Sequence, residues 1–246
     1  MTAIVGVYCS DGVVIGTDSS ATFTAGQTRT IEQPTDKLHI TGGSVIVAGT
    51  GAVGMTQRFC QVVENAWSNK QFQGSPIEIG KLLSKNAQED FVSTGAPKGK
   101  YGALVAFPCK KQPYLSEFEV EHFQPELKTE SLWYVSMGSS QHITDPFLGL
   151  MRDVFWREGC PTVRQAVFSV TWALDHAVQL NPGGVNEPVR IAVLERSKGD
   201  LAARILDEVE LDEHREAIQS AKESLRDFAR KVGTDAADVI DLPEPD

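Results

Sequence analysis

The stretch TAIVGVYCSDGVVIGTDSSATFTAG, residues 2–26, decides the fold of this chain. Two runs rich in β-branched residues, TAIVGVYC and GVVIGTDS, flank Asp11-Gly12, a pair that supplies the positive φ of a tight hairpin turn. We therefore predict that the chain opens with a β-hairpin. A single acid, Asp18, follows at the end of its second strand.

The same pattern recurs a short distance downstream. DKLHIT and SVIVAG, within residues 36–49, bracket Gly42-Gly43. A second hairpin is expected here, extending the same sheet.

After Gly49 the apolar residues change to helical spacing. Residues 53–67 place one apolar face toward a core, and Pro76 suits the first turn of a helix over residues 76–91. Two consecutive helices are predicted; the apolar face of the first consists of Met55, Phe59, Val62 and Val63.

The second half of the chain repeats this order. Strand composition returns over residues 101–107, 113–120 and 132–138, which we expect to form a second antiparallel group. Two helices and a closing hairpin follow, over residues 145–156, 162–180, 189–196 and 201–209.

Alternation of strand groups and helix pairs predicts an α+β fold in four αββα layers. Two antiparallel sheets would pack face to face, with a helix pair on each outer side. Residues 1–209 would form this domain, and residues 210–246 a C-terminal helix with an acidic tail. The apolar residues of that helix are Leu211, Ile218, Leu225 and Phe228.

Composition narrows the class of protein. The chain has 246 residues, 41% of them apolar, enough for one substantial core. Its net charge of −10 argues against a nucleic-acid partner, because neutralising phosphates needs a basic face. No apolar run is long enough to cross a bilayer and the first residues lack the pattern of a secretory signal, so we expect a cytoplasmic protein without a membrane partner.

The cysteines and histidines show no metal-ligand spacing. Cys9, Cys60, Cys109 and Cys160 lie far apart, and none of the 5 histidines has a suitably spaced partner. We expect reduced thiols, no metal and no cofactor.

Thr2 is a candidate nucleophile. A hydroxyl needs a base to take its proton, and a threonine at the start of a chain carries one in its own α-amine, with a pKa of about 8. Removal of Met1 before this small residue would free that amine. Taken alone, Thr2 is equally consistent with an ordinary small residue after the initiator.

Three further elements make the chain resemble the proteasome-type threonine proteases: proteasome β-subunits, the heat-shock locus protease subunit and, most of all, their bacterial homologues. GTDSSATFTAG is similar to the family's strand-turn element, with Asp18, Ala21 and Thr22 in place. DKLHITGGSVIVAGTGAVG is similar to the stretch where a lysine opens one strand and Ala-Gly closes the next, here Lys37 and Gly49. YVSMGSS resembles the family's Gly-Ser element, and the likeness runs from Thr2 to about Arg196.

This resemblance implies an N-terminal-nucleophile hydrolase fold and a threonine-type endopeptidase. Thr2 would attack the substrate while the Lys37 ammonium lowers the cost of alkoxide character and Asp18 holds that ammonium. The backbone N–H of Gly49 would donate to the oxyanion, and Ser139 would stand near the Thr2 amine.

The resemblance also implies how substrate binds. An extended peptide would pair with the backbone along Thr22 and Gly49. The specificity pocket would be small or apolar, without a basic group, and lined by Ala21, Thr35, His39, Val47, Gly51 and Met55. His39 is equally consistent with a half-exposed strand histidine.

One part of the family pattern is absent. Many β-subunits place an aspartate three residues before Ser-Gly-Gly, whereas this chain has Gln179 and Pro182 at those places. Asp175, one helical turn earlier, could substitute or could simply lie on the helix surface.

The leading interpretation is a self-compartmentalising threonine endopeptidase that cuts peptides or unfolded proteins. The resemblance implies a homo-oligomer of stacked rings of six or seven subunits and allows for an ATP-dependent unfoldase as partner. Two alternatives stay open: a catalytically silent ring or scaffold subunit, and a different N-terminal-nucleophile amidohydrolase acting on a small amide.

Overall fold

The chain opens with an antiparallel hairpin of β1 (Ile4–Tyr8) and β2 (Gly12–Thr17) in the computed structural model, which describes residues 2–25, 28–95, 99–180 and 184–235. The predicted positive φ at its turn is wrong, because none of residues 10–12 has one. Glycine is required at residue 12 because the neighbouring strand leaves no room for a side chain. A Cβ there would lie 2.5 Å from the carbonyl oxygen of Leu194.

This hairpin lies inside the first of two five-stranded sheets. The strand order is β10-β1-β2-β11-β12, and all neighbours are antiparallel. Its other strands are β10 (Tyr134–Met137), β11 (Arg190–Ser197) and β12 (Asp200–Ile205). The closing hairpin is confirmed, although its second strand ends at Ile205 instead of residue 209.

The second hairpin starts the other sheet, so the prediction that it extends the first is wrong. Gly42 and Gly43 turn it at φ of 57° and 65°. The order of this sheet is β5-β6-β7-β8-β9. Its strands are β5 (Leu38–Thr41), β6 (Val45–Gly51), β7 (Tyr101–Cys109), β8 (Gln112–Phe118) and β9 (Pro125–Leu127).

The predicted second strand group is also divided between the sheets. β7 and β8 extend the second sheet, whereas β10 joins the first, where Met137 pairs with Ile4. Because β10 pairs with β1, the residues that follow β10 lie next to the start of β1.

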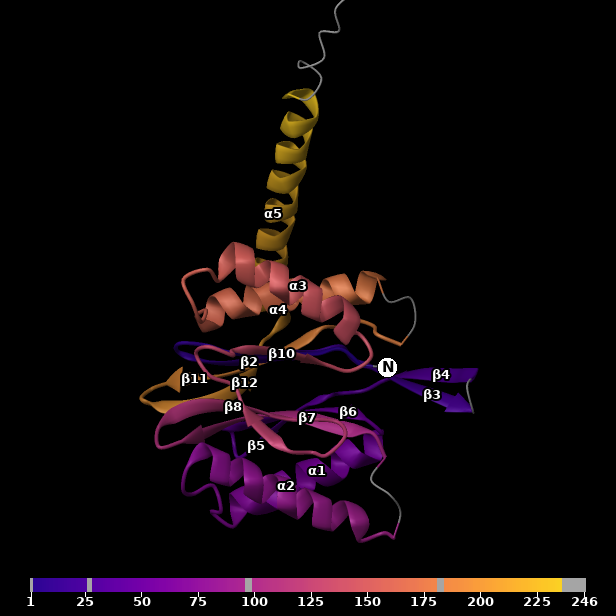
Figure 1. Cartoon of the computed structure of the whole chain (residues 1–246), viewed down its shortest axis with the longest axis vertical. Coiled ribbons are helices and arrows are strands. Elements are labelled where there is room, and N and C mark those ends of the chain that lie inside the picture. Colours follow the sequence, from indigo (N-terminus) through magenta and orange to yellow (C-terminus); the bar gives the residue numbers. More distant parts are fainter. Residues whose placement is uncertain (1, 26–27, 96–98, 181–183, 236–246) are drawn as a thin grey trace, which may run out of the picture.

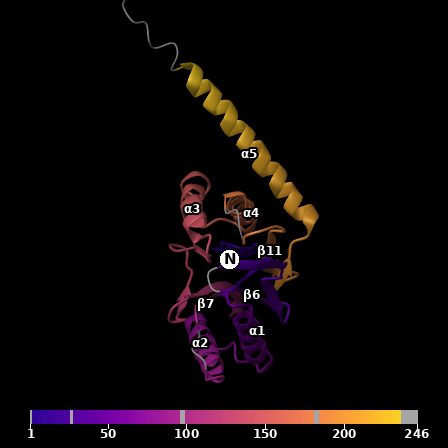
Figure 2. The same ribbon diagram turned by 90° about the vertical axis from the view of Figure 1, so that its right-hand side faces the viewer.

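Two helix pairs cover the outer faces of the sheets. α1 (Val53–Ser68) and α2 (Pro76–Val92) lie against the second sheet, and α3 (Gln141–Phe155) and α4 (Val163–Leu180) lie against the first (Figure 1). The predicted αββα order of layers is confirmed, and Figure 2 shows the same layers from the side. α3 begins at Gln141 instead of the predicted residue 145.

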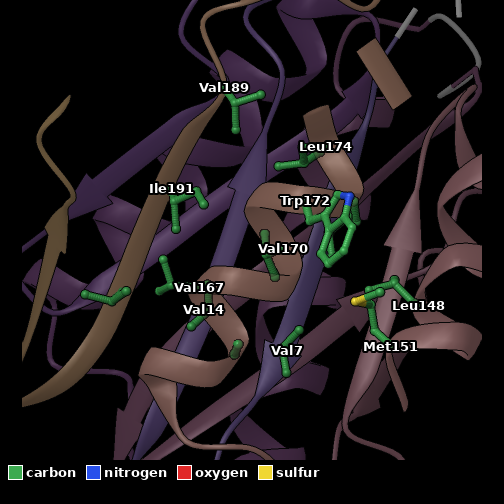
Figure 3. Close-up of a cluster of buried hydrophobic side chains, with 14 of the residues drawn as sticks. Val7, Val14, Leu148, Met151, Val167, Val170, Trp172, Leu174, Val189 and Ile191 are labelled. Carbon is green, nitrogen blue, oxygen red and sulfur yellow. The ribbon is translucent and has the colours of Figure 1, made fainter. Parts of the chain in front are cut away.

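Three apolar clusters hold these layers together. Alternate residues of a strand face opposite sides, so Ile4 packs between the two sheets while Val7 packs under α3 and α4. Figure 3 shows the second of these clusters, where Val170 and Trp172 of α4 lie above the first sheet. An aromatic cluster fills the space between the second sheet and its helices; it includes Phe59, Phe91, Tyr101, Phe118 and Phe123.

A third hairpin projects from the layers. β3 (Ser20–Ala25) pairs only with β4 (Thr28–Pro34) among the described strands, and the two extend beyond the sheets (Figure 1). The sequence analysis missed these strands because they are largely polar. Their cross-strand partners Phe23 and Ile31 are 44% and 52% exposed.

The C-terminal helix α5 (Glu208–Asp235) leaves the body of the protein (Figure 2). Leu211 and Ile218 are buried in the cluster under α4, whereas Leu225 and Phe228 are 60% and 65% exposed. Only the first half of the predicted apolar stripe is therefore anchored.

Candidate active site

Thr2 lies directly before β1, an inner strand of the first sheet, and shares a cavity with residues of β3. Figure 1 shows the N-terminus close to the base of the β3–β4 hairpin. The backbone beside Thr2 is tied to Asp18. Ala3 N donates to Asp18 Oδ1 at 2.9 Å, and Asp18 N donates to the Ala3 carbonyl at 3.2 Å. Thr2 is only 8% exposed, so the surrounding protein holds it in place.

Lys37 brings a cation to the Thr2 hydroxyl. Its Nζ donates to Asp18 Oδ1 at 2.6 Å and to Thr2 Oγ1 at 3.3 Å. Lys37 precedes β5 and Asp18 follows β2, so the two sheets contribute one residue each. Burial lowers the pKa of Lys37 below its ordinary 10.5, and the Asp18 carboxylate opposes that change.

The turn after β10 holds the Thr2 backbone from the other side. Thr2 N donates to Ser139 Oγ at 3.0 Å, and Ser140 N donates to the Thr2 carbonyl at 3.3 Å. Gly138 permits this approach at φ of 99°, since a Cβ there would lie 2.2 Å from the Thr2 carbonyl oxygen. Ser139 therefore stands beside Thr2 N, where the sequence analysis expected it.

A cavity of about 700 Å³ opens beside Thr2. Its lining combines both sheets, the β3–β4 hairpin and the first turn of α1. Of the residues expected at the site, those that line it are Thr2, Ala21, Thr22, Thr35, Lys37, His39, Gly49, Gly51 and Ser139.

Val47 and Met55 lie elsewhere. Val47 is fully buried in the aromatic core between the second sheet and its helices, and the half-buried Met55 packs against that core. Neither is among the residues that line the cavity. Gly49 approaches the same core closely, since a Cβ on it would lie 2.6 Å from Thr56 Oγ1 and 2.7 Å from Tyr101 Oη.

Several cavity residues were not singled out from the sequence. The polar ones are Ser20, Asp36, Thr50, Thr56 and Gln57, and the apolar ones are Phe23, Ala52 and Val53. Their sequence neighbours Ala21, Thr35, Lys37, Gly51 and Met55 had been selected, so adjacency was the available signal.

The charges in the cavity are few. Asp36 pairs with Arg190 NH2 at 3.2 Å, a partner outside the lining. Burial lowers the pKa of His39 below 6.5, with Asp36 opposing the change. His39 is therefore neutral at pH 7.

Asp175 is not among the described residues that line the cavity beside Thr2. Burial raises its pKa, and the charged groups acting on it are Arg215 and Lys222 of α5 together with Glu187. Gln179 is exposed at the end of α4, and Pro182 lies outside the described residues.

The arrangement is suited to one kind of chemistry. A hydroxyl beside a carboxylate-held ammonium and a neighbouring main-chain nitrogen can be activated for attack on a carbonyl group. Within the described ranges, no three His, Cys, Asp or Glu side chains gather as metal ligands, and no helix is both long and apolar enough to cross a membrane.

Comparison with known proteins agrees with this geometry. A model of the proteasome subunit family matches residues 2–148. Curated proteins give no match to the sequence.

Solved structures of bacterial Anbu, the ancestral β-subunit, have the same fold. The Yersinia bercovieri protein matches with a TM-score of 0.67 and 16% identity over 99% of both chains. A Gly-1 mutant from Hyphomicrobium sp. strain MC1 matches with a TM-score of 0.71 and 14% identity over 100% of both. A helical assembly of the Anbu complex from Pseudomonas aeruginosa matches with a TM-score of 0.68 and 16% identity over 99% of this chain and 98% of that one.

The matched residues 2–148 contain Thr2, Asp18, Lys37 and the turn after β10. Because that match extends over more than half of the sequence, this chain belongs to the proteasome subunit family.

Proposed function

We propose that this chain is a threonine endopeptidase that cuts peptides or unfolded proteins inside an assembly of its own copies. Thr2 is the nucleophile after removal of Met1. The observation that carries the proposal is the Lys37 ammonium, buried 3.3 Å from Thr2 Oγ1 and 2.6 Å from Asp18 Oδ1. A buried ion pair contributes little net stability, because desolvation offsets its attraction. Placed beside a hydroxyl in a cavity, it can instead activate that hydroxyl as a nucleophile.

The Thr2 amine acts as the base of the reaction. It takes the hydroxyl proton as Thr2 Oγ1 attacks the substrate carbonyl, and it gives that proton to the departing amine of the cleaved peptide. Water then attacks the resulting ester, its proton passing through the same amine, and the Thr2 hydroxyl is restored. Lys37 stabilises the negative charge that develops on Oγ1.

Gly49 and Thr22 orient the substrate. The Gly49 N–H donates to the oxyanion, and an extended peptide pairs along Thr22 and Gly49 beside the cavity. Ser139, 3.0 Å from Thr2 N, positions the amine. The pocket formed by Ala21, Thr35 and His39 suits a neutral side chain, because His39 is neutral at pH 7 and the charges of the described lining are paired, Lys37 with Asp18 and Asp36 with Arg190.

Residues 1–209 are the catalytic domain and residues 210–246 an extension of it. Self-assembly is supported by the helical assembly of a structurally similar protein. Measuring the mass of the particle distinguishes the stacked rings of six or seven subunits from an open helix. The four free cysteines are consistent with a protein of the reducing cytosol. An ATP-dependent unfoldase there would supply it with unfolded chains.

Peptide hydrolysis by protein of defined N-terminus tests the proposal. Intact mass first establishes that Met1 is gone, and turnover of a fluorogenic peptide is then compared between wild type and Thr2→Ala. We expect turnover by wild type and none by Thr2→Ala. No turnover by Met-free wild type over a panel of neutral, acidic and basic peptides would instead favour the silent ring subunit.

A further inference from the structure

A buried chain of hydroxyl groups connects the first turn of α3 to β10, directly behind the turn that holds Thr2. Thr144 Oγ1 donates to Ser136 Oγ at 2.8 Å, and Ser136 Oγ donates to a carboxylate oxygen of Asp145. Ser136 and Thr144 are each 1% exposed. Neither residue lines the cavity beside Thr2.

The direction of these hydrogen bonds follows from counting protons. An ionised carboxylate only accepts, so the single hydroxyl proton of Ser136 points to Asp145. The Ser136 oxygen is then an acceptor for the proton of Thr144. Asp145 is exposed on α3 and orients both hydroxyl groups from the solvent side of the buried pair.

The chain of hydroxyl groups is attached to the Thr2 turn through Ser140. The Ser140 carbonyl accepts from Ile143 N at 2.8 Å and from Thr144 N at 2.9 Å. Thr144 Oγ1 lies 3.1 Å from the same carbonyl, but its single proton is donated to Ser136. Ser140 N in turn donates to the Thr2 carbonyl at 3.3 Å. Moving the first turn of α3 would thus move Ser140 together with its contact to Thr2.

β10 closes the arrangement on its other side. Ser136 pairs with Val5 and Met137 with Ile4 in β1, the strand that begins just after Thr2. Thr144 therefore clamps α3 to β10, the strand that pairs with β1 just after Thr2. The turn between them, which includes Ser139, has both of its ends fixed.

On the basis of the proposed function, we propose that Thr144 and Ser136, oriented by Asp145, are positioning residues for the Thr2 nucleophile. They act through Ser139 and Ser140, fixing the Thr2 nitrogen and carbonyl against the Lys37 ammonium. This assigns an acid of α3 to the support of the nucleophile, since Asp175 interacts with α5.

Steady-state kinetics of Thr144→Val test this assignment. Valine keeps the shape of threonine but lacks the hydroxyl. We expect kcat to fall about 10-fold to 100-fold, the cost of a misplaced reacting group, with KM changed less than about twofold. Thr144→Ser restores the hydroxyl and should recover most of kcat, and Ser136→Ala should resemble Thr144→Val.

A buried hydroxyl far from Thr2 provides the matched control. Ser84 of α2 is 4% exposed and donates to the Phe123 carbonyl at 2.6 Å. Ser84→Ala should lower the melting temperature about as much as Thr144→Val but leave kcat unchanged. Thermal melting and particle mass of all variants separate a folding defect from a positioning defect.

The outcomes distinguish this inference from the proposed function. If wild type turns over substrate and Thr144→Val matches its kcat, the positioning role is wrong while the endopeptidase stands. Equal losses of kcat in Thr144→Val and Ser84→Ala would also overturn it, since they would reflect stability alone. Absence of turnover by Met-free wild type counts against the endopeptidase itself.

Discussion

The carbonyl oxygen of Thr2 lies 2.2 Å from the position that a Cβ on Gly138 would occupy. Real Cβ atoms do not approach an oxygen so closely, so any side chain at this residue must displace the chain around Thr2. The turn after β10 and the start of β1 are thus packed so closely that not even a methyl group fits between Gly138 and the Thr2 carbonyl.

Gly138→Ala is expected to abolish the proposed peptide turnover without unfolding the protein. Displacement of Thr2 from the Lys37 ammonium should lower kcat about 100-fold. Gly199 provides the control, because it has the same φ of 99° and no atom within 4 Å of its Cβ position. Gly199→Ala carries the same backbone strain, about 1–2 kcal/mol, and should keep wild-type kcat. Equal kcat in the two variants would contradict this account of the turn.

Lys37→Met is expected to abolish turnover by removing the only cation beside Thr2 Oγ1 within the described cavity lining. Loss of one electrostatic group of this kind costs about 100-fold to 1,000-fold in kcat. Lys128 is a matched control, since it is 5% exposed and its Nζ contacts Glu117 at 2.6 Å and Glu126 at 2.5 Å.

Lys37→Met breaks a buried ion pair and leaves Asp18 unpaired, which destabilises by about 3–5 kcal/mol. Lys128→Met also removes a buried ammonium, but the side chains of its partners Glu117 and Glu126 are 19% and 56% exposed, so its loss in urea unfolding should be smaller. Only Lys37→Met should lose turnover. A fully active Lys37→Met enzyme would remove Lys37 from the mechanism.

Acid should destabilise the fold through three half-buried histidines. Burial lowers the pKa of His39, His176 and His214 below 6.5. Between each lowered pKa and 6.5 the unfolded chain binds more protons than the folded one, so the free energy of unfolding falls as pH falls. Asp175 acts in the opposite direction between its ordinary 3.8 and its raised pKa in the folded protein, because there the folded chain binds the extra proton.

Urea unfolding at about pH 7.5 and about pH 5.5, on either side of the ordinary histidine pKa, measures this dependence. Wild type should be less stable at the lower pH. His176→Gln and His214→Gln should each reduce the difference, whereas replacement of the exposed His142 should not. Equal stability of wild type at both values would count against these pKa directions.

The two halves of α5 should differ in their effect on stability. Ile218 is 3% exposed under α4, so Ile218→Ala should cost about 2–5 kcal/mol. Leu225 lies two turns further on and is 60% exposed, so Leu225→Ala should cost about 0.5 kcal/mol or less. Chemical denaturation of the two variants measures both. Similar losses of unfolding free energy in the two variants would contradict this difference and would mean that Leu225 is buried against another chain.

The sequence predicted the elements of this fold better than their partners. Gly42-Gly43 marked its hairpin because positive φ is a local property, whereas Asp11-Gly12 marked a hairpin that turns without it. Whether β5 and β6 would join β1 or face it across the core depends on contacts between distant residues, such as Ile4 and Ile46. Strands buried on both faces, such as β2 and β6, are apolar at nearly every residue. The alternation of polar and apolar residues therefore could not show which sheet each hairpin joins.

The same limit applies to the site. Asp18, Lys37 and Ser139 were expected from the resemblance to the proteasome-type threonine proteases, and the structure places all three around Thr2. Val47 shows what the resemblance does not settle, because its side chain is packed among aromatic residues of the core behind the cavity. Thr144 carries no signal in the sequence, since its contact to Ser136 exists only after α3 has docked on β10.

The most direct test of the account is the intact mass of Met-free protein after incubation with a peptide epoxyketone. This reagent forms its ring only when a threonine hydroxyl adds to the ketone and a free amine on the same residue opens the epoxide. We predict one inhibitor per wild-type chain and none on Thr2→Ala. An unmodified wild type with a proven Thr2 terminus, or equal labelling of Thr2→Ala, would contradict the claim that Thr2 is an activated nucleophile.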